Sequence, residues 1–269
     1  MKNASKTKMI GLAVLAMALL FPVSGRSQNL RGDYNYDGVV NVSDLSLMIS
    51  YLLTDEWNND GMAMGVRDTV MVNDIPLVMI RVEGGSYVNG SGATVTVGDF
   101  SIGRTEVTQE LWEAVMGNNP SYHSPRPQRP VEQVSWDDCQ EFLATLNEMT
   151  GLTFRLPWSV EWEYAARGGR YSHGYRYSGS DIPDLVAWYG QETNIPVQDV
   201  ALLTCNELGF YDMSGNVVEW CQDANPATPT SRMAAGGCIC QSASSCEVTS
   251  RKWAGRTVRN RYTGFRLAL

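Results

Sequence analysis

The cysteines are the residues of this chain with the clearest capacity for chemistry. All six lie between residues 139 and 246, and three of them, Cys238, Cys240 and Cys246, fall within nine residues. Thiolates are soft ligands that suit Cu(I), and in an oxidising compartment the same side chains can pair as disulfides. The even count allows many pairings, and the spacing selects none of them.

A second chemical pattern lies near the N-terminus, in residues 33–44 (DYNYDGVVNVSD). Oxygen-bearing side chains occupy loop positions 1, 3, 5, 9 and 12, and Gly38 at position 6 permits a tight turn. Ca²⁺ prefers six to eight oxygen ligands. We expect one calcium ion to be held by five side chains and one backbone carbonyl: Asp33, Asn35, Asp37, Val39, Asn41 and Asp44. The alternative is a surface turn rich in Asn and Asp.

Composition excludes several other kinds of site. The 269 residues carry a net charge of −8 and contain no run of Lys and Arg, so no nucleic-acid partner is expected. The only histidines are His123 and His173, which rules out a metal site built on several imidazoles. The length allows one large domain and a small accessory module.

The first 27 residues are typical of a cleaved signal peptide. Three lysines precede the uncharged apolar run Met9–Val23, and small residues follow it. This run of 15 residues is shorter than the ~20 that cross a bilayer. Cleavage after residue 27 would remove four of the 21 cations and leave 17 − 29 = −12. We expect a secreted, periplasmic or cell-surface protein without a membrane span in the mature chain.

The remaining pattern predicts the elements that position these residues. Leu45, Met48, Ile49 and Leu52 have helical spacing after the loop, and residues 57–70 are expected to be a linker. Strands are predicted over 76–82 and within 86–103. Capping signals predict helices that start after Thr108, after Ser135 with Asp138, and at Ser159. The result is an α+β fold rich in loops, with a small helical EF-hand-like unit at the N-terminus.

From about residue 70 to 269, the chain resembles the formylglycine-generating enzyme (sulfatase-modifying factor) family. The matching stretches are VEGGSYVNG, IGRTEVTQELWEAVMGNNPS, PVEQVSWDDC, FRLPWSVEWEYAARGG, NELGFYDMSGNVVEWCQD and GFRLAL. The resemblance implies a variant of the C-type lectin fold over 71–269. Residues 28–56 resemble a single dockerin calcium-binding repeat, which implies a cohesin-like scaffold as partner. Dockerins carry two such repeats, and only one is visible here.

The family's enzymes oxidise a sulfatase cysteine to formylglycine with molecular oxygen and copper held by two cysteines. Those cysteines stand four and nine positions after the second Gly of a Gly-Gly-Ser. Here that glycine is Gly237, so Cys246 matches, whereas Gln241 occupies the other position and Cys240 stands one residue early. The resemblance therefore implies copper chemistry at Cys240 and Cys246 only if Cys240 replaces the missing ligand. We favour a non-catalytic domain.

The resemblance also implies a structural calcium site at Asn216 and Glu219 of SGNVVEW. Carboxylate and amide oxygens suit this ion. The alternative from the residues is that Asn216 caps a turn and Glu219 pairs with an arginine.

The C-terminal segment, residues 236–269, resembles the variable tail of ligand-binding proteins that retroelements diversify. Gly237, Ala243, Arg251 and Phe265 keep the family pattern and are expected to form a framework. The positions expected to contact a protein or glycan ligand are Lys252, Trp253, Arg256, Arg261 and Tyr262. Drift after loss of catalysis would look similar, and both aromatic rings could instead belong to the core.

The calcium loop yields a direct prediction. We expect Ca²⁺ to order the helix of an isolated 28–56 segment, and Asp37→Ala to abolish this response because it removes one ligand and one charge. Circular dichroism and melting with and without calcium measure the effect. An unchanged spectrum would identify the loop as a simple turn.

Overall fold

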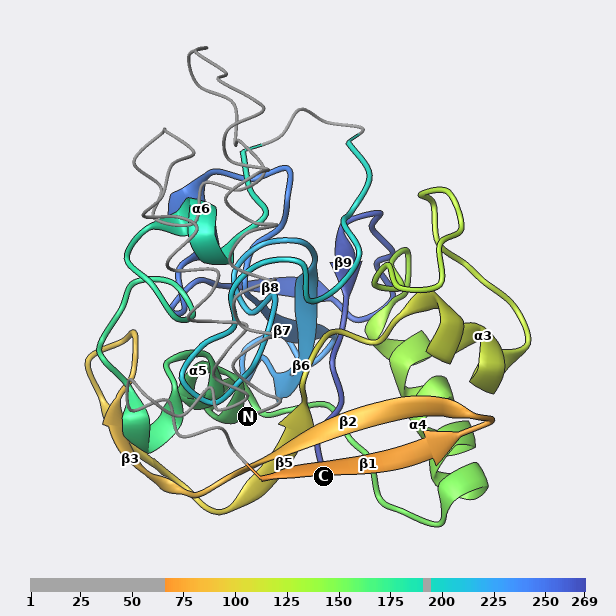
Figure 1. Ribbon diagram of the computed structural model, residues 1–269, viewed down its shortest axis with the longest axis horizontal. Coiled ribbons are helices and arrows are strands. Elements are labelled where there is room, and N and C mark those ends of the chain that lie inside the picture. The colour runs from red at the N-terminus through yellow and green to blue at the C-terminus, as the bar shows by residue number, and fades with distance from the viewer. Residues whose placement is uncertain (1–65, 191–194) are drawn as a thin grey trace, which may run out of the picture. The chain divides into compact units, whose positions relative to one another are not determined.

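The computed structural model describes residues 66–190 and 195–269 (Figure 1). The chain divides at Gly61 into two units, and the described residues all belong to the second. The predicted signal peptide, the calcium loop with its ligands and most of the linker lie outside the described residues, so they stay predictions.

The first sheet has the strand order β1-β2-β5, and all its neighbours are antiparallel. Its strands are β1 (Arg67–Val72), β2 (Ile75–Val82) and β5 (Phe100–Gly103). Asn73 and Asp74 both have positive φ, as a two-residue hairpin requires. Strand β1 begins inside the segment 57–70 that we expected to be linker, whereas β2 and β5 occupy predicted strand segments. A separate hairpin joins β3 (Gly85–Val88) and β4 (Thr94–Val97).

Three helices begin where the capping residues predict. They are α3 (Gln109–Met116), α4 (Trp136–Thr150) and α5 (Ser159–Ala166). The Thr108 side chain accepts a hydrogen bond from Leu111 N, and Ser135 and Asp138 form a reciprocal capping box. At α5 the capping residue is Trp158, whose N–H donates to Glu161. Together with the sheets, these helices confirm the α+β prediction.

The second sheet carries the C-terminal segment in the order β8-β7-β6-β9. Its strands are β6 (Val218–Ala224), β7 (Ser231–Ala235), β8 (Arg251–Gly255) and β9 (Thr263–Gly264). The short helices η1 (Gly169–Tyr171), α6 (Pro183–Val186) and η2 (Ala243–Cys246) interrupt long loops. Strand β8 lies at the edge of this sheet, whereas β9 runs parallel to β6.

The end of the chain connects the two sheets. After β9, Gly103 N donates to Leu267 O at 2.8 Å, and Leu269 N donates to Ser101 O at 2.9 Å. Residues 267–269 therefore extend the first sheet beside β5, on the side away from β2. Figure 1 shows the C-terminus close to β5. The segment that holds the predicted binding residues is thus anchored on both sides.

Aromatic side chains fill much of the core. Trp112 stacks on Phe142 with ring centroids 5.1 Å apart, and Phe265 meets both rings edge-on. The indole N–H groups of Trp136 and Trp220 donate to the carbonyls of Cys221 and Val134. Phe265 is fully buried, which agrees with its predicted framework role.

A buried ion pair crosses the centre of the domain. Arg266 Nε donates to Glu219 Oε2 at 2.6 Å and Arg266 Nη2 to Oε1 at 2.7 Å, and both side chains have no exposed area. Trp162 Nε1 of α5 donates to the same carboxylate at 2.7 Å. Two further acids, Glu106 and Asp212, are buried close enough to feel these charges.

Burial governs the protonation of these neighbouring acids. It raises the pKa of Asp212 to about 6 and that of Glu106 well above its usual value, while the Arg266 charge opposes both shifts. A carboxyl whose pKa is higher in the folded than in the unfolded chain stabilises the fold at low pH. That contribution is lost as the pH rises from the unfolded to the folded pKa.

Arg266→Leu should therefore destabilise the protein in a pH-dependent way. We expect a loss of about 3–5 kcal/mol in the free energy of unfolding, because buried carboxylates lose their counter-charge. The loss should be larger at about pH 8 than at about pH 5, where the acids hold protons. Urea unfolding at both pH values measures it, and equal losses would contradict the assigned role of Arg266.

Candidate functional site

The clustered cysteines lie in and just after the turn that leaves β7. Gln241 N donates to Cys238 O at 2.9 Å, and Gln241 Oε1 accepts from Cys238 N at 3.1 Å, so Gln241 closes the turn. Gly237 precedes it with φ of 69°, and a Cβ there would lie 2.3 Å from Ser245 O. Only glycine fits this position, which agrees with its predicted framework role.

These residues do not fit the two-cysteine copper site of the family's enzymes. The Cys240 Sγ contacts Cys238 Sγ at 3.0 Å, whereas Cys246 Sγ approaches Cys238 O at 3.8 Å. Gln241 stands at the missing ligand position, but its side chain holds the turn. Burial raises the pKa of Cys246 to about 12, which disfavours the thiolate that binds copper. Within residues 66–190 and 195–269, no group of three or more His, Cys, Asp or Glu side chains is arranged to hold a metal ion.

The structure gives Asn216 and Glu219 partners other than calcium. The Asn216 amide exchanges hydrogen bonds with the main chain of Gln198, at 2.9 and 3.2 Å, and its own φ is 55°. Both carboxylate oxygens of Glu219 accept from Arg266. The contacts therefore favour the alternative interpretation, in which Asn216 holds a turn and Glu219 pairs with an arginine.

Two of the predicted binding residues lie on the edge strand β8. Lys252 and Trp253 are both exposed, and Trp253 retains 42% of its surface. Arg251 at the start of the strand forms an ion pair with the fully buried Glu163 of α5. This pairing agrees with the framework role predicted for Arg251, and it fixes the strand beneath the exposed side chains.

The structure contradicts the predicted exposure of Tyr262. Tyr262 is only 5% exposed and belongs to the main hydrophobic core. The centroid of its ring lies 5.2 Å from that of the His123 ring. The Arg261 guanidinium carbon lies 5.3 Å from the centroid of the Tyr262 ring and 5.2 Å from that of the exposed Tyr122 ring. Tyr262 is part of the core because it directly precedes β9, whose pairing with β6 directs the chain inward.

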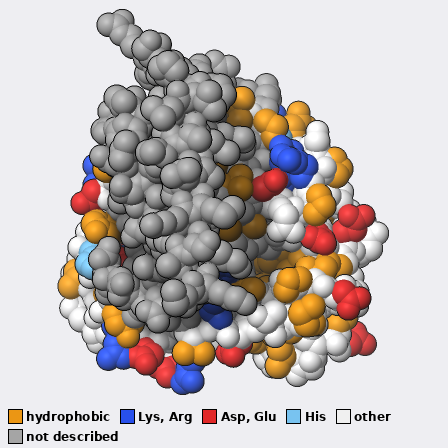
Figure 2. All heavy atoms as spheres, viewed as in Figure 1, with side chains coloured by type: hydrophobic (Ala, Val, Ile, Leu, Met, Phe, Trp, Pro, Cys, Tyr) orange, Lys and Arg blue, Asp and Glu red, His pale blue; other side chains and the backbone are white. Residues whose placement is uncertain are grey.

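Ion pairs neutralise two of the arginines in this C-terminal segment. Arg256 Nε lies 3.2 Å from Asp137 Oδ2, and Arg259 donates to both oxygens of Asp138. The two acids begin helix α4, far from the tail in sequence, so the tail alone gave no signal for them. Figure 2 shows acidic and basic side chains interspersed among apolar ones on the part of the visible face that the described residues form.

The main chain of β8 offers a feature that side-chain patterns do not reveal. Gly236 N donates to Ser250 O and Arg256 N donates to Thr230 O, so the even-numbered residues 250 and 256 pair with β7. Paired and unpaired positions alternate in an antiparallel ladder. The peptide groups of Arg251 and Trp253 therefore point away from β7, toward the open edge.

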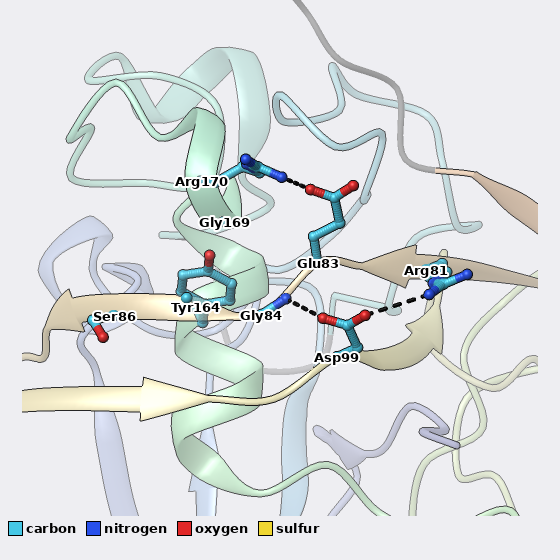
Figure 3. Close-up of a pocket in the computed structure, with 9 residues that line it drawn as sticks. Arg81, Glu83, Gly84, Ser86, Asp99, Tyr164, Gly169 and Arg170 are labelled. Carbon is cyan, nitrogen blue, oxygen red and sulfur yellow. Dashed lines mark hydrogen bonds and ion pairs between the residues drawn. The ribbon is translucent and has the colours of Figure 1, made fainter.

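A polar hollow of about 610 Å³ is lined by η1, by Tyr164 of α5, by Asp99 and by residues 81–86 where β2 ends and β3 begins (Figure 3). Arg170 pairs with Glu83, and Asp99 accepts from Arg81 Nη2 at 3.3 Å and Gly84 N at 2.9 Å. The charged groups of the hollow thus neutralise one another, and none of the predicted site residues lines it.

Among the described residues, no helix is long and apolar enough to span a membrane.

Known proteins resemble this chain over most of the described domain. Its residues 69–269 match the family described as sulfatase-modifying factor enzyme 1-like domain. The chain is 35% identical over 230 residues to chaperone protein LppX of Paenibacillus barcinonensis, with 64% of this chain and 81% of that protein covered. It is 30% identical over 193 residues to a formylglycine-generating enzyme of Thermomonospora curvata, with coverage of 58% and 60%.

An inactive relative and a solved structure complete the comparison. The inactive Cα-formylglycine-generating enzyme 2 of Bos taurus is 33% identical over 104 residues, which cover 34% of this chain and 32% of that protein. The structure of Treponema denticola variable protein 1 superposes with a TM-score of 0.70 at 29% identity, covering 76% of this chain and 99% of that one. The chain thus belongs to the sulfatase-modifying factor family, which includes both active formylglycine-generating enzymes and inactive homologues.

Proposed function

We propose that this domain is a non-catalytic binding module that holds a protein partner along strand β8. The observation that carries the proposal is the edge strand β8, where the exposed Trp253 stands beside peptide groups that point away from β7 and pair with no other described strand. An extended segment of a partner can add to such an edge through main-chain hydrogen bonds, while side-chain contacts give specificity.

The framework beneath this surface supports the proposal. Gly237, Arg251 and Phe265 are each fixed by close packing, a buried ion pair or the aromatic core. A binding surface gains affinity when its contacts are held in place before the partner arrives. Changes at Lys252 or Trp253 can therefore alter the ligand without disturbing the fold.

The relatives support the same proposal. One neighbour is named a variable protein and one relative is named inactive, so this fold occurs outside catalysis. In the present chain, the thiols do not fit the copper pair that the enzymes need. Tryptophan is enriched among the residues that dominate binding energy at protein interfaces. These properties favour a protein partner over a glycan, with Trp253 as its main contact and Lys252 as the contact for a carboxylate.

The sequence alone supports two further proposals. The chain is exported and cleaved after residue 27, and unit 28–56 binds calcium and a cohesin-like scaffold. The domain would then present its β8 surface outside the cytoplasm.

Selection from a phage-displayed library of random peptides tests the binding surface. For peptides selected on the wild-type chain, we expect Trp253→Ala to weaken binding about tenfold or more, because it removes the central contact. Trp158→Ala is the matched control, since Trp158 is 46% exposed but lies at the start of α5. Both variants should melt within a few degrees of the wild type.

Tyr262→Ala tests whether Tyr262 belongs to the core rather than to the binding surface. This variant should lose about 3–5 kcal/mol in the free energy of unfolding, because it truncates a buried aromatic ring. Two outcomes would overturn the proposal: selected peptides that bind Trp253→Ala as tightly as the wild type, or binding confined to a glycan array.

Copper-dependent oxidation is the second candidate function, favoured by the match at Cys246. We expect no formylglycine on a sulfatase-derived cysteine peptide when copper is supplied, because Gln241 replaces one of the two ligands. Mass spectrometry detects the aldehyde, and the Thermomonospora curvata enzyme serves as positive control. Product that forms here and disappears in Cys246→Ser would establish an enzyme.

A further inference from the structure

The turn after β7 brings two sulfur atoms into direct contact. The Sγ atoms of Cys238 and Cys240 lie 3.0 Å apart, and both thiols are free in this structure. A disulfide bond joins sulfurs at about 2.05 Å, so a displacement of about 1 Å separates this pair from a bond. We propose that Cys238 and Cys240 form a reversible disulfide within the turn, which makes this Cys-x-Cys pair a redox site of the domain.

Main-chain hydrogen bonds hold the turn in the arrangement that the proposed disulfide needs. Ile239 N donates to Asn216 O at 3.0 Å, and Gly190 N donates to Gln241 O at 2.6 Å. The residue between the two cysteines and the residue after them are therefore both fixed to neighbouring loops. The sulfur contact follows from this anchored backbone, so closing the bond requires little reorganisation.

The two thiols differ in access to solvent. Cys238 is buried, whereas Cys240 is half-buried. Burial raises the pKa of Cys238, and the contact with Cys240 raises it further. Because the thiolate is the attacking species, Cys240 is the thiol that meets an external reagent first.

Cys246 is the competing partner, and its surroundings disfavour it. Its Sγ has no exposed area, faces the Cys238 carbonyl oxygen at 3.8 Å, and packs under the Gly237 backbone. Burial also raises its pKa to about 12. A bond between Cys240 and Cys246 would require the turn to give up its present sulfur contact.

The reaction is a thiol–disulfide exchange, with a small-molecule disulfide as oxidant. The Cys240 thiolate attacks one sulfur of the oxidant, forms a mixed disulfide and releases one thiolate. Cys238 then loses its proton and attacks the Cys240 sulfur, which expels the second thiolate. The two cysteines lose two electrons and two protons, and the oxidant leaves as two thiols.

The bridge would lie next to the edge strand β8. The turn leaves β7 after Ala235, which pairs with Arg251 of β8. Burial raises the pKa of Cys238, and the Lys252 charge opposes this rise. Oxidation would also engage Cys240, the one cysteine that could replace the missing copper ligand. The disulfide proposal stands on the sulfur contact alone and does not depend on the proposed binding function.

Mass spectrometry of the full chain tests the pair. The purified protein is treated with oxidised glutathione, its remaining thiols are alkylated after unfolding, and trypsin then cuts after Arg232 and Arg251. The peptide 233–251 carries all three cysteines of the cluster. We expect this peptide to lose about 2 Da, the mass of two hydrogens, and to take up alkyl label only at Cys246. Dithiothreitol should restore labelling of all three.

Fragment ions of the wild-type peptide assign the bond without any variant. Backbone cleavage after residue 240 should give ordinary fragments, since the ring closes only over 238–240. Cys246→Ala should keep the bridge and Cys240→Ser should abolish it, with melting curves as the control for folding. Full labelling of all three thiols at excess oxidised glutathione, or a bridge to Cys246, would overturn the proposal.

Discussion

The ion pair between Arg266 and Glu219 is the constraint on which the rest of this domain depends. Two charges without contact to water are costly unless they neutralise each other, so the pair holds the C-terminal segment, through Arg266, against Glu219 of β6. Trp162 of α5 donates a hydrogen bond to the Glu219 carboxylate, which ties this helix to the ion pair. Helix, central strand and C-terminal segment are thereby held at one point, and the aromatic core packs around them.

This arrangement explains how a loop-rich domain can present a defined surface. Residues 236–262 leave β7 at a Gly-Gly pair with positive φ and return to the core at Tyr262. Between these two fixed ends, β8 is held by its pairing with β7 and by the ion pair of Arg251 with Glu163. Side chains that point outward from β8 contribute little to the fold, so they are free to serve recognition.

The sequence predicted what local chemistry determines. Capping residues set the starts of α3 and α4, because this signal lies within a few residues of the structure that it specifies. Tyr262 and Trp253 could not be separated this way. Each is an aromatic residue in a polar tail, and only the pairing of β9 with the distant β6 makes one of them core. The contact between Cys238 and Cys240 likewise depends on anchors at residues 190 and 216.

The order in which the chain is synthesised gains meaning from the position of Arg266. Glu219 is made long before its partner, and the first sheet remains without its added strand until residues 267–269 emerge. Without Arg266, burial of Glu219 would leave a carboxylate in the core with no counter-charge. The domain therefore needs residues 266–269 both to balance its buried charge and to complete the edge of its first sheet.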